Sequence, residues 1–169
     1  MRYRILLIVL SAVVLTSCRV SFSFTTASIS PDIRSVSIAY IPNNASMVEP
    51  ILSSTLREAL MDKFSRQTRM DVLREGGDIS FDGEITDYRI TPEAVTSDDE
   101  VASRMRLTIT VRMTFTNTID PSNNYSRTFS QFSSYPRDKS LQEVVPTLIP
   151  EIVDMLVTDM FNAAFSNNW

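Results

Sequence analysis

Cysteine occurs once in this 169-residue chain, at Cys18, and its thiol is the most reactive group that the sequence offers. Without a second cysteine it has no disulfide partner, and a metal site built on cysteines is excluded. It follows a start with two arginines, an apolar run over residues 5–15 and two small residues. This order predicts a signal peptide over residues 1–17, because the apolar run is too short for a transmembrane helix of about 20 residues.

The quartet Leu15-Thr16-Ser17-Cys18 resembles the lipobox of bacterial lipoproteins. The resemblance implies cleavage before Cys18, a diacylglycerol on its thiol and a third acyl chain on the freed amine. A single acyl chain binds a membrane only reversibly, whereas two or more anchor a protein stably. Arg19 directly follows the cysteine. An acidic residue at this position retains many lipoproteins at the inner membrane, and none is present here. The start therefore resembles that of a lipoprotein held on the periplasmic side of the outer membrane; the alternative is an incidental cysteine in an uncleaved leader.

Residues 18–169 have the length of one ordinary domain and suffice for a substantial core. Loss of residues 1–17 removes two arginines and moves the formal charge from −4 to −6. An acidic domain is a poor candidate for binding nucleic acid, so we expect no nucleic-acid partner.

The residues also argue against catalysis. The chain has no histidine and only three glycines, without a Gly-x-Ser-x-Gly elbow or a phosphate-binding glycine loop. Asp78, Asp82 and Glu84 could form a calcium site or an acid-base pair. Their alternation with Ile79 and Phe81 favours the solvated face of a strand instead. We therefore expect no catalytic residue, no cofactor and no metal.

A second charged group consists of Arg104, Arg106 and Arg112, which share one face of a predicted strand. The guanidinium fork matches phosphate oxygens, so this row is a candidate site for an anionic glycolipid. The alternative, which we favour, is pairing across the sheet with Asp82 and Glu84.

Alternation of apolar and polar side chains predicts β-structure in segments 20–24, 36–40, 70–73, 78–88, 104–115 and 125–135. In the last segment, the aromatic residues shift from odd to even sequence positions at Phe132, which predicts a bulge there. Phe129, Phe132 and Tyr135 could face a partner, but strand spacing favours the core. Residues 91–102 include Pro92 and show no apolar period, so they predict a loop.

Two helices are expected. Apolar spacing predicts one over roughly Val48 to Arg66. Ser140 and Glu143 have the form of a capping box that starts the other. Pro146 and Pro150 divide that one into a one-turn prelude and a main helix. Hairpin-linked strands and two apolar helix faces predict an α+β fold, an antiparallel or mixed sheet with two helices on one face.

The order of motifs along residues 18–169 is similar to that of the LptE family of lipopolysaccharide-assembly lipoproteins, in its divergent non-enterobacterial branch. No single motif besides the lipobox is specific; their order carries the resemblance. The motifs are Cys18-x-x-Ser21-Phe22, Ile29-x-Pro31, Ser37-Ile38-x-x-Ile41-x-Asn43, Leu60-x-Asp62-x-Phe64, Gly83-x-Ile85-x-x-Tyr88, Leu107-Thr108-Ile109 and Asp159-Met160-Phe161-Asn162 with Trp169.

The resemblance implies two helices on a four-stranded sheet. It also implies a non-enzymatic plug and assembly partner of the LptD β-barrel, acting with lipopolysaccharide at the outer membrane. A plug with polar strand faces suits the polar lumen of a large barrel. In the family, basic residues near a strand end have been linked to lipopolysaccharide contact, but no motif fixes the alignment well enough to carry those positions over, so Arg104, Arg106 and Arg112 stay a hypothesis.

Two other interpretations remain open. A small α/β lipoprotein could activate a cell-wall synthase from its outer-membrane anchor, and the copurifying partner would discriminate this role from the first. A lipid-anchored hydrolase would need catalytic residues that the sequence does not show.

Overall fold

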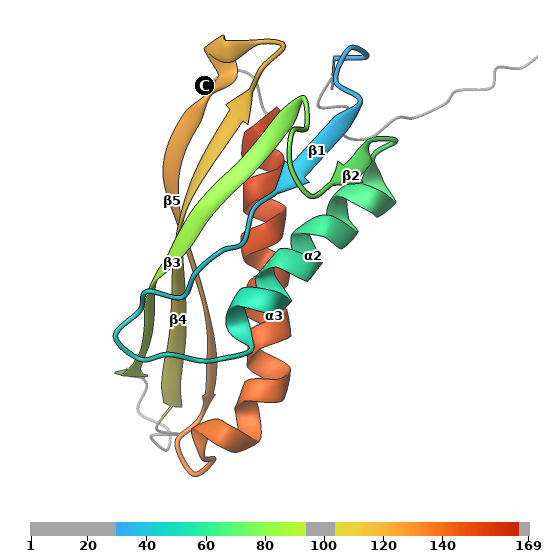
Figure 1. Ribbon diagram of the computed structural model, residues 1–169. Coiled ribbons are helices and arrows are strands. Elements are labelled where there is room, and N and C mark those ends of the chain that lie inside the picture. Colours follow the sequence, from blue (N-terminus) through green and yellow to red (C-terminus); the bar gives the residue numbers. More distant parts are fainter. Residues whose placement is uncertain (1–29, 94–103, 166–169) are drawn as a thin grey trace, which may run out of the picture.

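A computed structural model describes residues 30–93 and 104–165, which form a two-layer α+β domain (Figure 1). The signal peptide, Cys18 and the strand predicted over 20–24 lie outside the described residues. The elements are β1 (Ser35–Ile38), α2 (Leu52–Gln67), β2 (Asp71–Leu73), β3 (Ile79–Glu93), β4 (Arg104–Asn117), a 3-10 turn η1 (Pro121–Asn123), β5 (Tyr125–Pro136) and α3 (Leu141–Phe165).

The sheet is mixed and has five strands in the described part of the chain, in the order β2-β1-β3-β4-β5. β1 is parallel to both of its neighbours, whereas β3, β4 and β5 form an antiparallel meander. The expected α+β class is correct, but the expected number of four strands is wrong. The segment predicted as β-structure over residues 70–73 forms β2, which joins the same sheet as its fifth strand and pairs through three residues with β1 after the chain has crossed over in α2.

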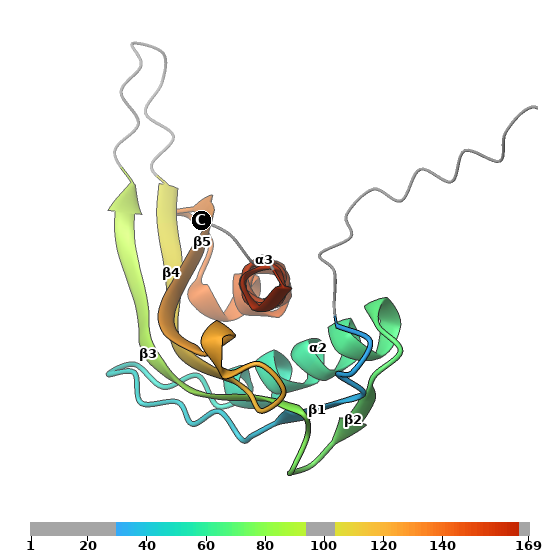
Figure 2. The ribbon, with the colours of Figure 1, turned by 90° about the horizontal axis from the view of Figure 1, so that it is seen from above.

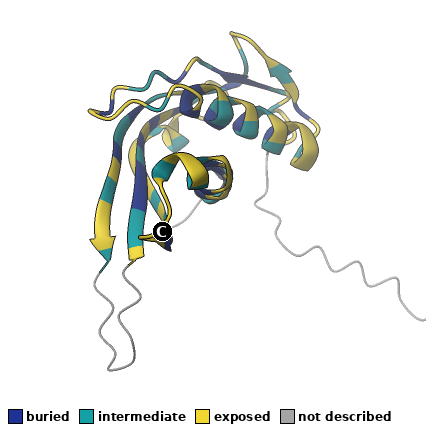
Figure 3. Ribbon diagram, turned by 90° about the horizontal axis from the view of Figure 1, so that it is seen from below, coloured by how far each residue is buried: buried dark blue, intermediate teal, exposed yellow. Residues whose placement is uncertain are grey.

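Both helices lie on the concave side of the curved sheet, as predicted (Figure 2). One apolar stripe of α2 is fully buried, namely Leu52, Leu56, Leu60 and Phe64. The Phe64 ring joins the layers, because its centroid lies 5.1 Å from that of Phe81 in β3 and 5.2 Å from that of Phe161 in α3. The outer sides of the helices and much of the far face of the sheet are exposed (Figure 3).

The helix boundaries differ from those predicted. α2 begins at Leu52 rather than Val48, because Pro50 disfavours helical backbone at the residue before it. α3 is one continuous helix that includes Pro146 and Pro150, so the predicted division into prelude and main helix is wrong. Figure 1 shows its first turns at an angle to the rest, as expected where two prolines lack the N–H that the helix would use.

The predicted capping box at the start of α3 forms in part. The Glu143 carboxylate accepts a hydrogen bond from the Ser140 N–H at 2.8 Å. The Ser140 hydroxyl also donates to that carboxylate, at 3.0 Å, whereas the Glu143 N–H donates to the Ser140 carbonyl. The Ser140 N–H, followed by the Ser140 hydroxyl, holds the pKa of Glu143 below its ordinary value.

Two predictions about the meander are wrong. β3 continues to Glu93, so residues 91–93 are strand rather than loop; residues 94–102 lie outside the described part. The register of β5 on β4 is unbroken, and the bulge lies in β3 between Ile85 and Asp87. Phe132 changes parity because it lies on the exposed face of the sheet, not because the strand is irregular.

Asp78 connects the beginning of the described chain to the turn before β3. Its carboxylate accepts from the backbone N–H groups of Arg34 and Ser35 at 2.8 and 3.0 Å, and from the Ser35 hydroxyl at 2.9 Å. The Arg34 N–H, followed by the Ser35 hydroxyl, lowers the pKa of Asp78. Of the three acids considered for chemistry, this one therefore has a structural role.

The lowered pKa of Asp78 predicts a pH-dependent contribution to stability. We expect Asp78→Asn to lower the midpoint of thermal unfolding at pH 7, where the native and unfolded carboxyls are both ionised. The difference from the parent should shrink as the pH falls below the unfolded pKa of about 3.9 and through the lower native pKa, because protonation then removes the same charge from the parent. Melting curves between pH 2.5 and 7 test this, with Asp82→Asn, an exposed acid on β3, as control. An effect of Asp78→Asn that is constant over this range would contradict the assignment.

Candidate functional site

The face of β3, β4 and β5 that is turned away from both helices is polar, and we call it the open face. The opposite side of β4 is buried and apolar, with Leu107, Ile109, Val111, Met113 and Phe115. The alternation of a strand puts the intervening residues on the other side. The open face comprises Asp82, Glu84, Asp87, Arg89, Thr91 and Glu93 of β3, Arg104, Arg106, Thr108, Thr110, Arg112 and Thr114 of β4, and Ser126, Thr128, Ser130, Phe132 and Ser134 of β5.

All three candidate arginines lie on the open face, but not as one cluster. Arg104 and Arg106 are neighbours at the beginning of β4, opposite Glu93 and Thr91. Arg112 is six residues further along, which is about 20 Å in an extended strand. One phosphate group can therefore contact the first two arginines together, but not all three.

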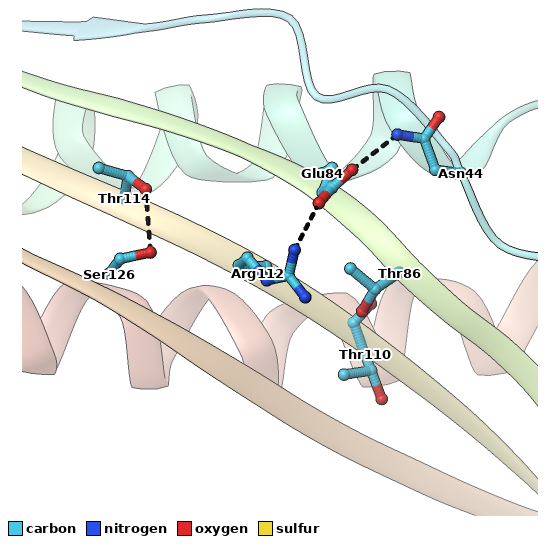
Figure 4. A network of polar contacts seen from close by, with 7 residues as sticks. All are labelled: Asn44, Glu84, Thr86, Thr110, Arg112, Thr114 and Ser126. Carbon is cyan, nitrogen blue, oxygen red and sulfur yellow. Dashed lines mark hydrogen bonds and ion pairs between the residues drawn. The ribbon is translucent and has the colours of Figure 1, made fainter.

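Arg112 belongs to a network in the middle of the sheet (Figure 4). Its Nη1 lies 2.9 Å from Oε1 of Glu84, and Nδ2 of Asn44 donates to the other oxygen at 2.7 Å. The expected pairing with Glu84 is confirmed, whereas Asp82 lies opposite Thr114 and not opposite an arginine. Asn44 was not predicted, because it lies in the segment that follows β1, 40 residues away from Glu84.

Arg106 is held more closely than Arg112. Its guanidinium forms an ion pair with Glu93 and lies over the Phe132 ring, with 4.0 Å between Cζ and the ring centroid. Its Nε is buried and has no hydrogen-bond partner among the described residues. The side chain of Ser134 and then that of Arg106 lower the pKa of Glu93 by hydrogen bonding. Arg104 donates from Nη2 to the Ser134 carbonyl at 2.7 Å.

Sequence reasoning missed two members of this end of the open face. Glu93 falls in the segment that was predicted as a loop, and Phe132 was expected in the core, whereas its side chain is 47% exposed. Phe132 has an even sequence number, like the polar residues of β5 that lie on the open face. This alternation was the signal that could have assigned Phe132 to that face. Of the other two aromatic residues, Tyr135 is buried and Phe129 is partly buried against the core, as expected.

Hydroxyl groups occupy the space between the charged positions. Thr110 and Ser130 are hydrogen-bonded at 2.9 Å, and Thr114 donates to Ser126 at 3.1 Å. Within residues 30–93 and 104–165, no group of three metal-ligating side chains could hold a metal ion. No helix in the same residues is long and apolar enough to cross a membrane. The side chains of the open face offer polar and ionic contacts.

These features define a small α+β domain whose helices cover one side of a sheet and whose other side presents charged and hydroxyl groups. A family model described as LptE, lipopolysaccharide-assembly, matches residues 33–164, and the chain belongs to this family. Membership gives the chain a role in lipopolysaccharide transport, in a family of membrane-associated lipoproteins. A search of curated protein sequences finds no significant match.

The solved structures that resemble this domain are distant in sequence. The hypothetical protein CT253 from Chlamydia trachomatis is 8% identical, with 79% of this chain and 99% of that chain covered and a TM-score of 0.53. A minor lipoprotein from Acinetobacter baumannii is 12% identical, with 76% and 94% covered and a TM-score of 0.48. Lipoprotein GNA1162 from Neisseria meningitidis is 9% identical, with 76% and 99% covered and a TM-score of 0.43.

The different surroundings of the arginines predict different effects on stability. Arg106→Ala removes the contact with Phe132 and the partner of Glu93, and we expect it to lower the free energy of unfolding by about 1 kcal/mol. Arg112 is 59% exposed, so Arg112→Ala should cost less than about 0.5 kcal/mol. Urea unfolding of the purified variants measures both. Equal losses would contradict the distinction.

Proposed function

We propose that this chain is the plug and assembly partner of an LptD-like β-barrel, and that it supports the insertion of lipopolysaccharide into the outer leaflet of the outer membrane. The observation that carries the proposal is the open face, where three strands present almost only charged and hydroxyl side chains to the outside. The lumen of a large outer-membrane barrel is also polar, so the charged side chains of this face can pack against the lumen wall without being buried against apolar side chains. Membership of the lipopolysaccharide-assembly family supports the same role.

The proposed location follows from the sequence. Lipidation at Cys18 would anchor the domain on the periplasmic side of the outer membrane, next to the periplasmic opening of a barrel. Two or more acyl chains make such an anchor stable.

We further propose that the protein acts without catalysis. The whole chain lacks histidine, and the residues described here contain no cluster of metal ligands. Two of the three acids first considered for chemistry have structural contacts, since Asp78 holds the chain before β1 and Glu84 holds Arg112.

Contact with lipopolysaccharide is assigned in this proposal to Arg104, Arg106 and Arg112. The first two arginines, with the exposed Phe132 ring beside them, make the better site, because two guanidinium groups and an apolar surface lie together there. A phosphate on this site would compete with Glu93 for Arg106, and one at Arg112 would compete with Glu84.

The partner can be tested by purification from native membranes. A tag at the C-terminus, mild detergent extraction of the outer membrane and mass spectrometry should recover a large LptD-like barrel in near one-to-one amount. Untagged cells are the control. A peptidoglycan synthase in near one-to-one amount would support the role in cell-wall synthesis instead. Recovery of neither a barrel nor a synthase would refute the plug proposal.

The lipid contact can be tested separately. Alanine at Arg104, Arg106 and Arg112 together should weaken lipopolysaccharide binding by at least about fivefold, because charge-assisted hydrogen bonds to phosphate are lost. A matched variant with alanine at the exposed Arg66, Arg69 and Arg74 removes the same charge from elsewhere on the domain and should bind like the parent. Unchanged binding by the first variant, or equal losses in both, would refute the site.

A further inference from the structure

A groove runs along one side of α2, between this helix and the edge strand β2 of the sheet. Its volume is about 630 Å³; α2 lines it with residues between Thr55 and Ser65, and β2 contributes Val72. The side chain of Val72 lies on the helix side of the sheet, because its partner in the parallel register is the buried Val36. The groove therefore opens at the edge of the domain, on the side that the helices cover.

The groove has an apolar floor and an acidic rim. Ala59, Met61 and Val72 are only partly buried against the core, so apolar surface remains accessible between the two elements. Glu58 is exposed at the rim and forms no ion pair within residues 30–93 and 104–165. A segment that fits here would have apolar side chains on one side and a positive charge at the end near Glu58.

The described chain begins beside one end of this groove. The Asp71 N–H donates to the Arg34 carbonyl at 2.9 Å, which places the residues before β1 next to the beginning of β2 and the end of α2. The Ile33 N–H donates to the Ser30 carbonyl at 3.0 Å and closes a turn. Because such a turn reverses the direction of the chain, a segment that continues from Ser30 would lead back along α2, from the end of this helix toward its beginning.

Residues 20–24 have the pattern that the groove requires. They lie outside the described residues, and their sequence alternates Val20, Phe22 and Phe24 with serine. In extended form such a segment has its three apolar side chains on one side. Arg19 comes directly before it, is the one charged residue in 19–29, and is opposite in sign to Glu58. The sequence before the turn is thus complementary to the groove in both hydrophobicity and charge.

The length of this part of the chain also agrees with the groove. From Thr55 to Ser65 the helix rises about 15 Å. Residues 20–24 are about 16 Å long when extended, and residues 25–29 supply about the same length between the turn and the groove. The segment therefore fills the groove without strain in the connection.

We propose that residues 20–24 lie in extended form in the groove between α2 and β2. Phe24 would be nearest the end of α2, and Val20 nearest its beginning. Arg19 would then lie within reach of the Glu58 carboxylate. Burial of the three apolar side chains against the floor of the groove favours docking. The loss of chain entropy is limited, because the turn already holds the segment beside the groove.

Docking would determine how far the domain lies from its point of attachment. Residues 18–29 can span about 40 Å when free. With residues 20–24 in the groove, only Cys18 and Arg19 of this stretch extend beyond it. In a chain anchored through Cys18, α2 and β2 would then lie next to the membrane. This consequence rests on the proposed function, whereas the docking itself does not.

Disulfide crosslinking of the full chain in fresh lysates tests the docking. Phe22→Cys is combined with Met61→Cys in the groove or, as a matched control, with Leu73→Cys. Leu73 follows Val72 in β2, so its side chain lies on the other side of the sheet at a similar distance from the turn. Mild oxidation should join position 22 to position 61 at least about fivefold more than to position 73, because only a docked segment holds the first pair within disulfide distance.

Tryptic peptides identify each bond by mass spectrometry. Cleavage after Arg19 separates Cys18 from position 22. Positions 61 and 73 fall in the peptides of residues 58–63 and 70–74. Any crosslink of Cys18 is thereby counted separately.

A further substitution tests whether the apolar contact causes the crosslink. Added to the pair at positions 22 and 61, Phe24→Ser removes an apolar side chain from the docked face and should reduce the crosslink at least about fivefold. Thr25→Ser, at the next position and on the other side of an extended segment, should leave it unchanged. Equal recovery of the two variants shows that both are produced and folded.

Equal crosslinking of positions 61 and 73, or a crosslink that Phe24→Ser does not reduce, would overturn the proposal. No crosslink to position 61, the result expected when a partner protein or a lipid occupies the groove, would overturn it as well. The outcome does not depend on which barrel or synthase copurifies, so it is distinguishable from the outcome for the proposed function.

Discussion

The rest of the structure depends on the strict alternation of β4. An extended strand places successive side chains on opposite sides, so the five buried apolar residues from Leu107 to Phe115 require the four polar residues between them to face the other way. The buried row needs a cover, which α3 supplies, and α2 lies on the same side of the sheet over β1 and β2. The other side remains uncovered because it has nothing apolar to hide except Phe132. The architecture of one layer of helices and the existence of an open polar face are thus two results of a single pattern.

Local patterns predicted the local structure well. The alternation of β4, the apolar stripe of α2 and the glutamate of the α3 cap were visible because neighbours within a few residues determine them. What the sequence could not show depends on distant segments. The β-structure predicted over residues 70–73 is present as β2, but its parallel pairing with β1 follows only because α2 returns the chain beside that strand. Pairing with Arg104 and Arg106 likewise extends β3 into residues whose own composition is that of a loop.

The same distinction applies to the candidate site. Arginines two residues apart had to share a face, and they do, but only the register of β3 and β5 shows that Arg106 lies between Glu93 and Phe132. Each guanidinium described on the open face already has an intramolecular contact, so this surface is an arranged set of ion pairs rather than a bare positive patch. Such a surface recognises a polar partner by exchange of contacts, which favours specific over merely electrostatic association.

The bonds of Asp78 also have a mechanical consequence. The described chain enters the fold through the residues just before β1, and this carboxylate holds Arg34 and Ser35 at the point of entry. Within the described residues, tension along the N-terminal segment would therefore reach these bonds first, and then β1, which is bonded on both sides to parallel neighbours. Pulling along strands shears all of their hydrogen bonds together instead of opening them one after another. A load from the end at which a tether to a membrane would pull is thus resisted by the hydrogen bonds on both sides of β1 at once.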